Sequence, residues 1–384
     1  MTTAPLSRLP VPADVNYVGV FLTFRCNLDC SYCINDPVQQ GNRGALVHRG
    51  CSEMSPQQWA AALGRLDLPA DLPLTLQGGE PTLYDHGRGL GEILAAVDAR
   101  FDLLTNLALP PERMALCLGA SANKLRREAP YPSIRVSYHP AEMNRVWGEG
   151  ITTLIERCER LAELGFAVTG DKRTSDVGIY MVDHPDNAAA FRQARAAAEG
   201  RVAFEAKEFL GMHDGQLYGT YKYPFSTNLL AGGIFDRPLP CECRTSELLI
   251  DPLGFIWPCH FYLYETWTRT PPIAAFRAMT EAGFVMDGAL ADAMPFRPVG
   301  HILDPGLSLA DIRRFHPCTS YGQCIGCDTK VKNDRFQSLE DLGQAHTSVD
   351  IRAIAMPEAV LSQVDATMRQ RLVTAGILAA PKER

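Results

Sequence analysis

The chain has 384 residues, of which 46% are hydrophobic and 21% are charged, a balance typical of a globular protein long enough for a large domain and a smaller one. The formal net charge of −7 argues against a surface that binds nucleic acid or an anionic membrane. No apolar run reaches the roughly 18 residues of a membrane span, and the first residues lack the apolar segment of a signal peptide. These features predict a cytoplasmic protein that binds neither nucleic acid nor membrane.

Short β-rich runs alternate with helical patterns over the first half of the chain. The predicted strands are residues 17–24, 72–77, 101–106, 133–138, 177–183 and 201–209, and the predicted helices are residues 55–66, 87–100, 151–166 and 185–200. This alternation predicts an α/β protein with a parallel sheet and crossover helices. Because six βα units are fewer than the eight of a closed barrel, we expect a partial (β/α)6 TIM-like barrel.

The alternation stops after Tyr218, and residues 240–335 are rich in Pro, Gly and Cys. We expect a small cysteine-rich α+β domain there, with a hairpin over residues 245–258 that turns at "DPLG". The tail contains an amphipathic helical pattern over residues 357–378. The predicted organisation is therefore an N-terminal extension (1–16), a barrel core (17–225), the cysteine-rich domain (240–335) and a helical tail (336–384).

Twelve cysteines need an explanation, because a reducing cytosol disfavours structural disulfides. Nine of them form three groups with short gaps, which favours metal binding over packing. These groups are Cys26, Cys30 and Cys33, then Cys241, Cys243 and Cys259, then Cys318, Cys324 and Cys327. Of the three single cysteines, Cys51 is expected in a polar loop, and Cys117 and Cys158 are expected in the core as small apolar side chains.

The first group follows the first predicted strand with C-x3-C-x2-C spacing at Cys26, Cys30 and Cys33. Structural zinc sites usually reach four ligands, so a zinc site here would need His48 or Cys51 as the fourth. The alternative is a three-cysteine [4Fe–4S] cluster, which leaves one iron open to a substrate or cofactor.

This cysteine loop, with Tyr32 before its last cysteine and with "GGEP" at Gly78, Gly79, Glu80 and Pro81 after the second strand, resembles the radical S-adenosylmethionine (SAM) enzyme superfamily. The resemblance implies a [4Fe–4S] cluster on the three cysteines, with SAM bound to the open iron. It also implies one-electron cleavage of SAM to methionine and a 5′-deoxyadenosyl radical that abstracts a hydrogen atom from the substrate.

The same resemblance suggests the residues that contact SAM. The two glycines would let the backbone approach the methionine portion, and Glu80 is a candidate acceptor for its amino group. Asn106 and Ser137 end the third and fourth strands, where polar contacts to SAM are expected. The alternatives are that Asn106 is a turn residue and that His139 faces the substrate.

The second group contains C-x10-G-x4-C from Cys243 through Gly254 to Cys259, which resembles the opening of the twitch and SPASM auxiliary-cluster domains. The resemblance implies an auxiliary [4Fe–4S] cluster on Cys243, Cys259, Cys324 and Cys327, with Cys318 and Cys241 as substitutes. Six cysteines are too few for two complete four-thiolate sites, so the twitch domain is the better match. A zinc knuckle is the alternative.

The first functional hypothesis is a radical SAM enzyme that oxidises, epimerises or rearranges a small metabolite, with a low-potential electron donor such as flavodoxin or ferredoxin. The second is a peptide-modifying maturase, of the RiPP type or similar to sulfatase maturases. About 16 residues precede the first strand, which leaves no room for a leader-binding domain and lowers the expectation of a peptide. The third is a non-catalytic iron–sulfur protein for electron transfer or sensing, against which the GGEP motif argues.

Overall fold

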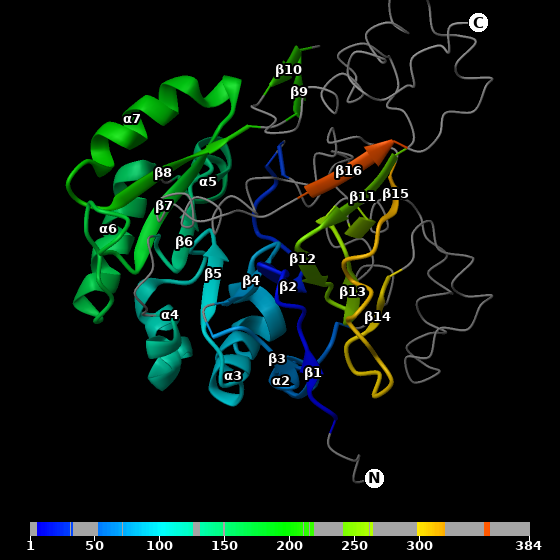
Figure 1. Ribbon diagram of the computed structural model, residues 1–384. Coiled ribbons are helices and arrows are strands. Elements are labelled where there is room, and N and C mark those ends of the chain that lie inside the picture. The colour runs from blue at the N-terminus through cyan, green and yellow to red at the C-terminus, as the bar shows by residue number, and fades with distance from the viewer. Residues whose placement is uncertain are drawn as a thin grey trace, which may run out of the picture.

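A nine-stranded mixed sheet is the centre of the fold, in the order β14-β13-β12-β2-β4-β5-β6-β7-β8 (Figure 1). The computed structural model describes residues 6–30, 32–33, 53–70, 72–125, 131–148, 150–209, 211–214, 216–218, 241–260, 262–263, 298–318 and 349–353. Six parallel strands follow one another in chain order: β2 (Tyr17–Thr23), β4 (Leu74–Gly78), β5 (Phe101–Thr105), β6 (Ile134–Ser137), β7 (Val177–Asp183) and β8 (Ala203–Glu208). The predicted α/β class with a parallel sheet is confirmed, and the sequential strand order is that of a partial barrel.

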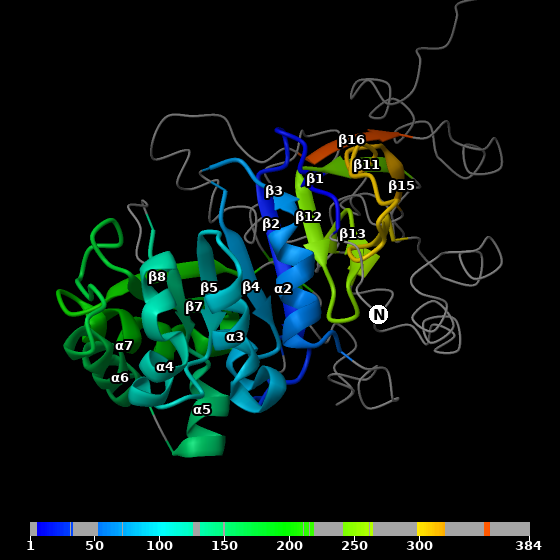
Figure 2. The ribbon, with the colours of Figure 1, turned by 90° about the horizontal axis from the view of Figure 1, so that it is seen from below.

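Helices connect the parallel strands and lie along one side of the sheet (Figure 2). They are α2 (Pro56–Gly64), α3 (Gly89–Ala96), α4 (Pro111–Leu118), α5 (Pro140–Trp147), α6 (Ile151–Glu163) and α7 (Ala188–Ala198), with 3-10 helices η1 (Pro81–Gly87), η2 (Gly119–Lys124) and η3 (Pro185–Asn187). Ser55 caps α2, whose position matches the predicted helix over residues 55–66, in a reciprocal capping box with Gln58. The sequence did not predict α4 and α5, which are only eight residues long and bury few side chains.

The two faces of the parallel strands differ in polarity. The face toward the helices is apolar and forms the core with residues such as Val18, Val20, Leu76, Leu103 and Ile134. Cys158 of α6 is fully buried in this core, as predicted, and Cys117 of α4 is partly buried against it. The opposite face carries buried polar side chains, among them Thr75, Gln77, Asp102 and Arg135. The two faces differ because successive side chains along each strand point to opposite sides of the sheet.

The predicted hairpin is present as β12 (Glu247–Ile250) and β13 (Phe255–Trp257), and β14 (Gly300–His301) extends it. Its turn holds Gly254 at φ +93°, and the buried carboxylate of Asp251 accepts hydrogen bonds from Leu253 N and Phe255 N. β12 also pairs in parallel with β2, so the hairpin continues the barrel sheet (Figure 1).

Three small sheet elements complete the described chain. β1 (Leu9–Pro10) pairs with β3 (Leu66–Asp67), β9 (Gly211–His213) pairs with β10 (Gln216–Tyr218), and β11 (Cys241–Thr245) lies between β15 (His316–Cys318) and β16 (Val349–Ala353). The predicted tail helix over residues 357–378 and Cys51 lie outside the described residues. Among the described helices, none combines the length and apolar character needed to cross a membrane.

Candidate functional site

The carboxyl ends of β2, β4, β5 and β6 meet at one edge of the sheet, because these strands are parallel neighbours. The cysteine loop follows β2, and the GGEP segment begins at Gly78, the last residue of β4. Asn106 follows β5, and Ser137 is the last residue of β6. Ser137 is partly exposed there, in register with Tyr180 of β7. The tertiary structure thus brings the predicted N-terminal site residues to one edge.

Two backbone hydrogen bonds join the GGEP segment to the start of the cysteine loop. Gly79 N donates to Thr23 O at 2.8 Å, and Glu80 N donates to Arg25 O at 2.8 Å. A Cβ on Gly79 would lie 2.2 Å from Arg25 O, and a Cβ on Gly78, whose φ is +136°, would lie 2.1 Å from Thr23 O. The close approach that requires these glycines is therefore made by the chain's own cysteine loop, and their contact with SAM stays a prediction.

The Glu80 carboxylate joins the ends of β4 and β5. Its Oε1 accepts hydrogen bonds from Thr82 N at 3.0 Å, Thr82 Oγ1 at 2.6 Å and Thr105 Oγ1 at 2.7 Å. Its Oε2 accepts one from Asn106 N at 2.5 Å. Burial raises the pKa of Glu80, and these hydrogen bonds oppose that rise because they favour the carboxylate. Its described contacts fix the backbone of Asn106, and its predicted role as an acceptor for SAM is untested.

Cys26 of the cysteine loop accepts hydrogen bonds from two N–H groups of the described residues. Its Sγ accepts hydrogen bonds from Leu28 N at 3.4 Å and from Asn106 Nδ2 at 3.7 Å. Asn106 Nδ2 also donates to Asn27 Oδ1 at 2.9 Å, which orients the amide. Asn106 Oδ1 is buried without a hydrogen-bond partner in the described part of the chain. The predicted site residue Asn106 therefore contacts the cysteine loop directly and leaves one acceptor unused.

The rest of the cysteine loop is held by α5. Asp29 N donates to Glu142 Oε2 at 2.6 Å, and Arg145 binds both oxygens of the same carboxylate at 3.0 and 2.7 Å. Cys30 is buried, Cys33 is partly exposed, and Cys33 N donates to Cys30 O at 3.1 Å. Within the described ranges, no group of three or more His, Cys, Asp or Glu side chains is close enough to form a metal site.

Two histidines at strand ends surround Tyr32 of the cysteine loop. Tyr32 Oη lies 3.2 Å from Nδ1 of His139, which follows β6. The Tyr32 ring stacks on His184, which follows β7, with centroids 5.1 Å apart. Burial, then the nearby Cys30, raises the pKa of Tyr32, so its phenol stays protonated. Sequence reasoning considered His139 but missed His184, although each precedes a proline and is the N-cap of the helix that follows its strand.

Glu53 is a second residue that the sequence did not indicate. Its carboxylate accepts hydrogen bonds from Thr23 Oγ1 at 2.5 Å and Arg25 Nη2 at 3.0 Å, at the start of the cysteine loop. Tyr84 Oη donates to the backbone oxygen of the next residue, Met54. No motif surrounds Glu53, so only the tertiary structure could reveal it.

The hairpin brings together the chain segments that carry Cys243 and Cys259. Thr245 Oγ1 donates to Pro258 O at 2.5 Å, so the side chain two residues after Cys243 contacts the backbone of the residue before Cys259. Cys259 is buried. Backbone pairing also places Cys241 opposite Cys318. Cys324 and Cys327 lie outside the described residues, and the auxiliary-cluster set remains a prediction.

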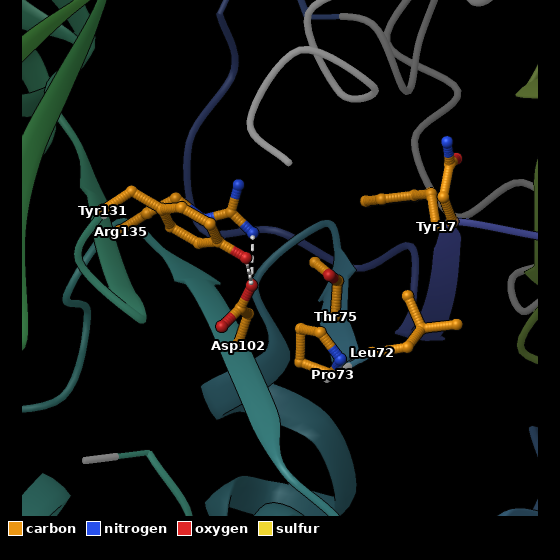
Figure 3. A pocket seen from close by; sticks show the side chains of 8 residues that line it. Tyr17, Leu72, Pro73, Thr75, Asp102, Tyr131 and Arg135 are labelled. Carbon is orange, nitrogen blue, oxygen red and sulfur yellow. Dashed lines mark hydrogen bonds and ion pairs between the residues drawn. The ribbon is translucent and has the colours of Figure 1, made fainter. Parts of the chain in front are cut away.

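A small pocket at the amino ends of the same strands is a separate feature (Figure 3). Asp102 Oδ2 accepts hydrogen bonds from Tyr131 Oη at 2.9 Å and from Arg135 at 3.4 Å, beside Tyr17 and Thr75 (Figure 3). The pocket has room for about one water molecule. Because it lies at the opposite ends of the strands from Cys26, we treat it as part of the buried polar interior.

Comparisons with known proteins give a limited likeness. No protein-family profile matches the sequence, and a search of curated proteins found no match. Similar solved structures include SuiB of Streptococcus suis bound to S-adenosylmethionine, with a TM-score of 0.39 and 13% identity over 71% of this chain and 68% of that chain. They also include SuiB bound to the precursor peptide SuiA, with a TM-score of 0.37 and 12% identity over 75% of this chain and 70% of that chain. At these low identities and TM-scores, the function has to be inferred from the geometry and chemistry of the site itself.

Proposed function

We propose that this protein is a radical SAM enzyme that holds a [4Fe–4S] cluster on Cys26, Cys30 and Cys33 and binds SAM at the open iron. The observation that carries the proposal is the direct attachment of the GGEP segment to the cysteine loop by two backbone hydrogen bonds. The two motifs that together resemble this superfamily are thus one structural unit at the carboxyl edge of a parallel sheet.

The three described cysteines of the loop are not gathered at the spacing of a single-ion site, but the chemistry of the residues present fits such a group in two ways. Three thiolates are the ligands that iron–sulfur clusters prefer, and three rather than four leave one iron open. The buried Oδ1 of Asn106, beside Cys26, lacks a donor in the described part of the chain, as expected where an N–H group of a cofactor completes the site. The cluster with SAM would supply one-electron cleavage of SAM and hydrogen abstraction from the substrate.

The chain's own residues would position and shield this chemistry. Glu80 and Asn106 fix the first cysteine, Glu142 fixes the loop at Asp29, and Tyr32 would contact the cofactor between two imidazoles. Ser137 and Pro81 stay candidate SAM contacts from the resemblance. Burial of these groups would keep water away from a reactive radical.

An auxiliary [4Fe–4S] cluster is the second part of the proposal. It would use Cys243 and Cys259 with Cys324 and Cys327, and Cys318 or Cys241 would be the substitutes. Its support is the hairpin that joins the segments next to Cys243 and Cys259. The C-terminal region would then act as a twitch-like module, with flavodoxin or ferredoxin as the electron donor.

The substrate is either a small metabolite or a peptide. We include the peptide because SuiB has been solved with a precursor peptide, although likeness at that level places no peptide on this chain. A third candidate is an iron–sulfur protein that only carries electrons. The tight packing of the GGEP glycines on the cysteine loop allows a purely structural role for that motif and so keeps this candidate open.

The deciding experiment measures iron, sulfide and SAM cleavage in anaerobically reconstituted protein. The proposal expects about eight irons per chain for two [4Fe–4S] clusters, about four in a Cys26→Ala/Cys30→Ala/Cys33→Ala variant, and 5′-deoxyadenosine formation only in the wild type. Equal iron content in both proteins would refute the N-terminal cluster. A bound cluster that never cleaves SAM under strong reduction would favour the electron-transfer candidate.

A further inference from the structure

Asn106 connects the GGEP motif to a cysteine, and this connection rests on three contacts. The buried Glu80 carboxylate accepts a hydrogen bond from the backbone N of Asn106 at 2.5 Å and so fixes the position of the Asn106 backbone. Asn106 is 5% exposed, and its Nδ2 donates to both Cys26 Sγ at 3.7 Å and Asn27 Oδ1 at 2.9 Å. The amide therefore has one orientation, with its N–H group toward the sulfur.

Cys26 differs from an ordinary thiol because N–H donors converge on its sulfur. Leu28 N, at 3.4 Å, donates from the loop itself, and Asn106 Nδ2 donates from a different strand end. Such donors stabilise negative charge on a thiolate. In iron–sulfur proteins, hydrogen bonds to the sulfurs are one of the features that set the reduction potential.

We propose that Asn106 is a positioning residue that raises the reduction potential of the cluster held by Cys26, through its side-chain N–H···S hydrogen bond. This inference rests on the proposed function, because it requires a cluster at Cys26. It assigns Glu80 an indirect part: the carboxylate holds Asn106, and Asn106 acts on the sulfur. The reduced cluster carries one more negative charge than the oxidised one, so the N–H donor favours reduction.

The test is a redox titration, followed by electron paramagnetic resonance, of the full-length, anaerobically reconstituted protein. The signal that changes when SAM is added identifies the N-terminal cluster. Asn106→Leu removes the donor at similar size, and Asn106→Asp keeps the shape but replaces the amide N with oxygen. The matched control is Asn123→Leu, at an exposed asparagine of η2.

We expect both Asn106 variants to lower the reduced-to-oxidised ratio at a fixed potential by about tenfold, which is about 59 mV for a one-electron couple. The control should match the wild type. An unchanged midpoint in Asn106→Leu would overturn the inference, and so would a shift in Asn106→Asp alone, because that pattern reports a new charge. If Asn106→Leu loses iron, the test passes to Asn106→Asp. The inference then expects this variant to lose the coupling, measured by pulsed EPR, between an exchangeable deuteron and this cluster.

Failure of the proposed function gives a different result. In that case the triple cysteine variant keeps all of its iron, and the wild type shows no signal that responds to SAM. Failure of the inference alone leaves the wild-type cluster, its iron content and its response to SAM intact, with an Asn106 midpoint equal to that of the wild type.

Discussion

Gly79→Ala tests whether the GGEP segment and the cysteine loop form one packed unit. The new Cβ would lie 2.2 Å from Arg25 O, 2.5 Å from Arg25 C and 2.6 Å from Phe24 O. All three atoms are backbone, so no flexible side chain can move aside. The strand end or the loop must shift, and the hydrogen bonds from Gly79 N and Glu80 N to the loop, both 2.8 Å, would lengthen or break.

The cost follows from two contributions. Overpacking of a well-filled site costs about 1–3 kcal/mol, and each lost hydrogen bond costs about 0.5–1.5 kcal/mol. Together they lower the free energy of unfolding by about 4 kcal/mol, a large part of the roughly 5–15 kcal/mol of a typical domain. Urea unfolding of the cluster-free protein, followed by far-ultraviolet circular dichroism, measures this change.

Gly64→Ala is the matched control for this prediction. Gly64 is the last residue of α2, and a Cβ there would meet nothing within 4 Å. Alanine is the better helix former, so this variant should gain about 0.5–1 kcal/mol. A Gly79→Ala protein within about 1 kcal/mol of the wild type would refute the reasoning. A faster reaction of Cys26 with a thiol reagent would show that the damage reaches the cysteine loop.

Three further predictions concern stability. Burial lowers the pKa of His301 from the ordinary 6.5 to about 4. The protein therefore has its full free energy of unfolding above pH 6.5 and loses about 3 kcal/mol of it as the pH falls toward 4. His301→Gln should flatten this part of a urea-unfolding pH profile, and an unchanged profile would contradict the cause. Asp102→Ala leaves the buried Arg135 guanidinium without its carboxylate and should lower the free energy of unfolding by about 3–5 kcal/mol. An Asp102→Leu/Arg135→Met double variant should recover most of that loss in the same assay. A double variant as unstable as the single one would argue against the ion pair as the source of the loss. Ser55→Ala removes the side-chain cap of α2 and should lower the melting temperature in line with a loss of about 1 kcal/mol, while an unchanged melting temperature would show that the cap is dispensable.

The predicted elements that match the structure depend on local patterns. The apolar runs of the six parallel strands, the helix that begins after Ser55 and the "DPLG" hairpin turn are each set by a few neighbouring residues. The helical spacing of residues 151–161 also predicted the buried position of Cys158. The short helices α4 and α5 each begin at a proline and end just before a glycine, local helix signals that the prediction did not use.

The sequence predicted a small cysteine-rich domain over residues 240–335, and it did not indicate that β12, within that range, pairs with β2 of the main sheet. Asn16 and Ser246 join the two segments through a backbone and a side-chain hydrogen bond, at 3.0 and 2.7 Å. All four residues of β12 are buried, and a continuous apolar run within "ELLI" is the signal of a strand covered on both faces. Partner choice across about 230 residues depends on long-range packing, which a local pattern does not contain.

The sequence by itself determined the composition of the candidate site: three cysteines after the first strand, two glycines and a glutamate after the second, and an asparagine after the third. Only the tertiary structure decided what these residues do to one another. It packs the glycines on the cysteine loop, directs the Glu80 carboxylate to Asn106, and aims the Asn106 amide at Cys26. The physical reason is that spacing along the chain fixes residue type and strand position, while hydrogen-bond partners are set where parallel strand ends meet in space.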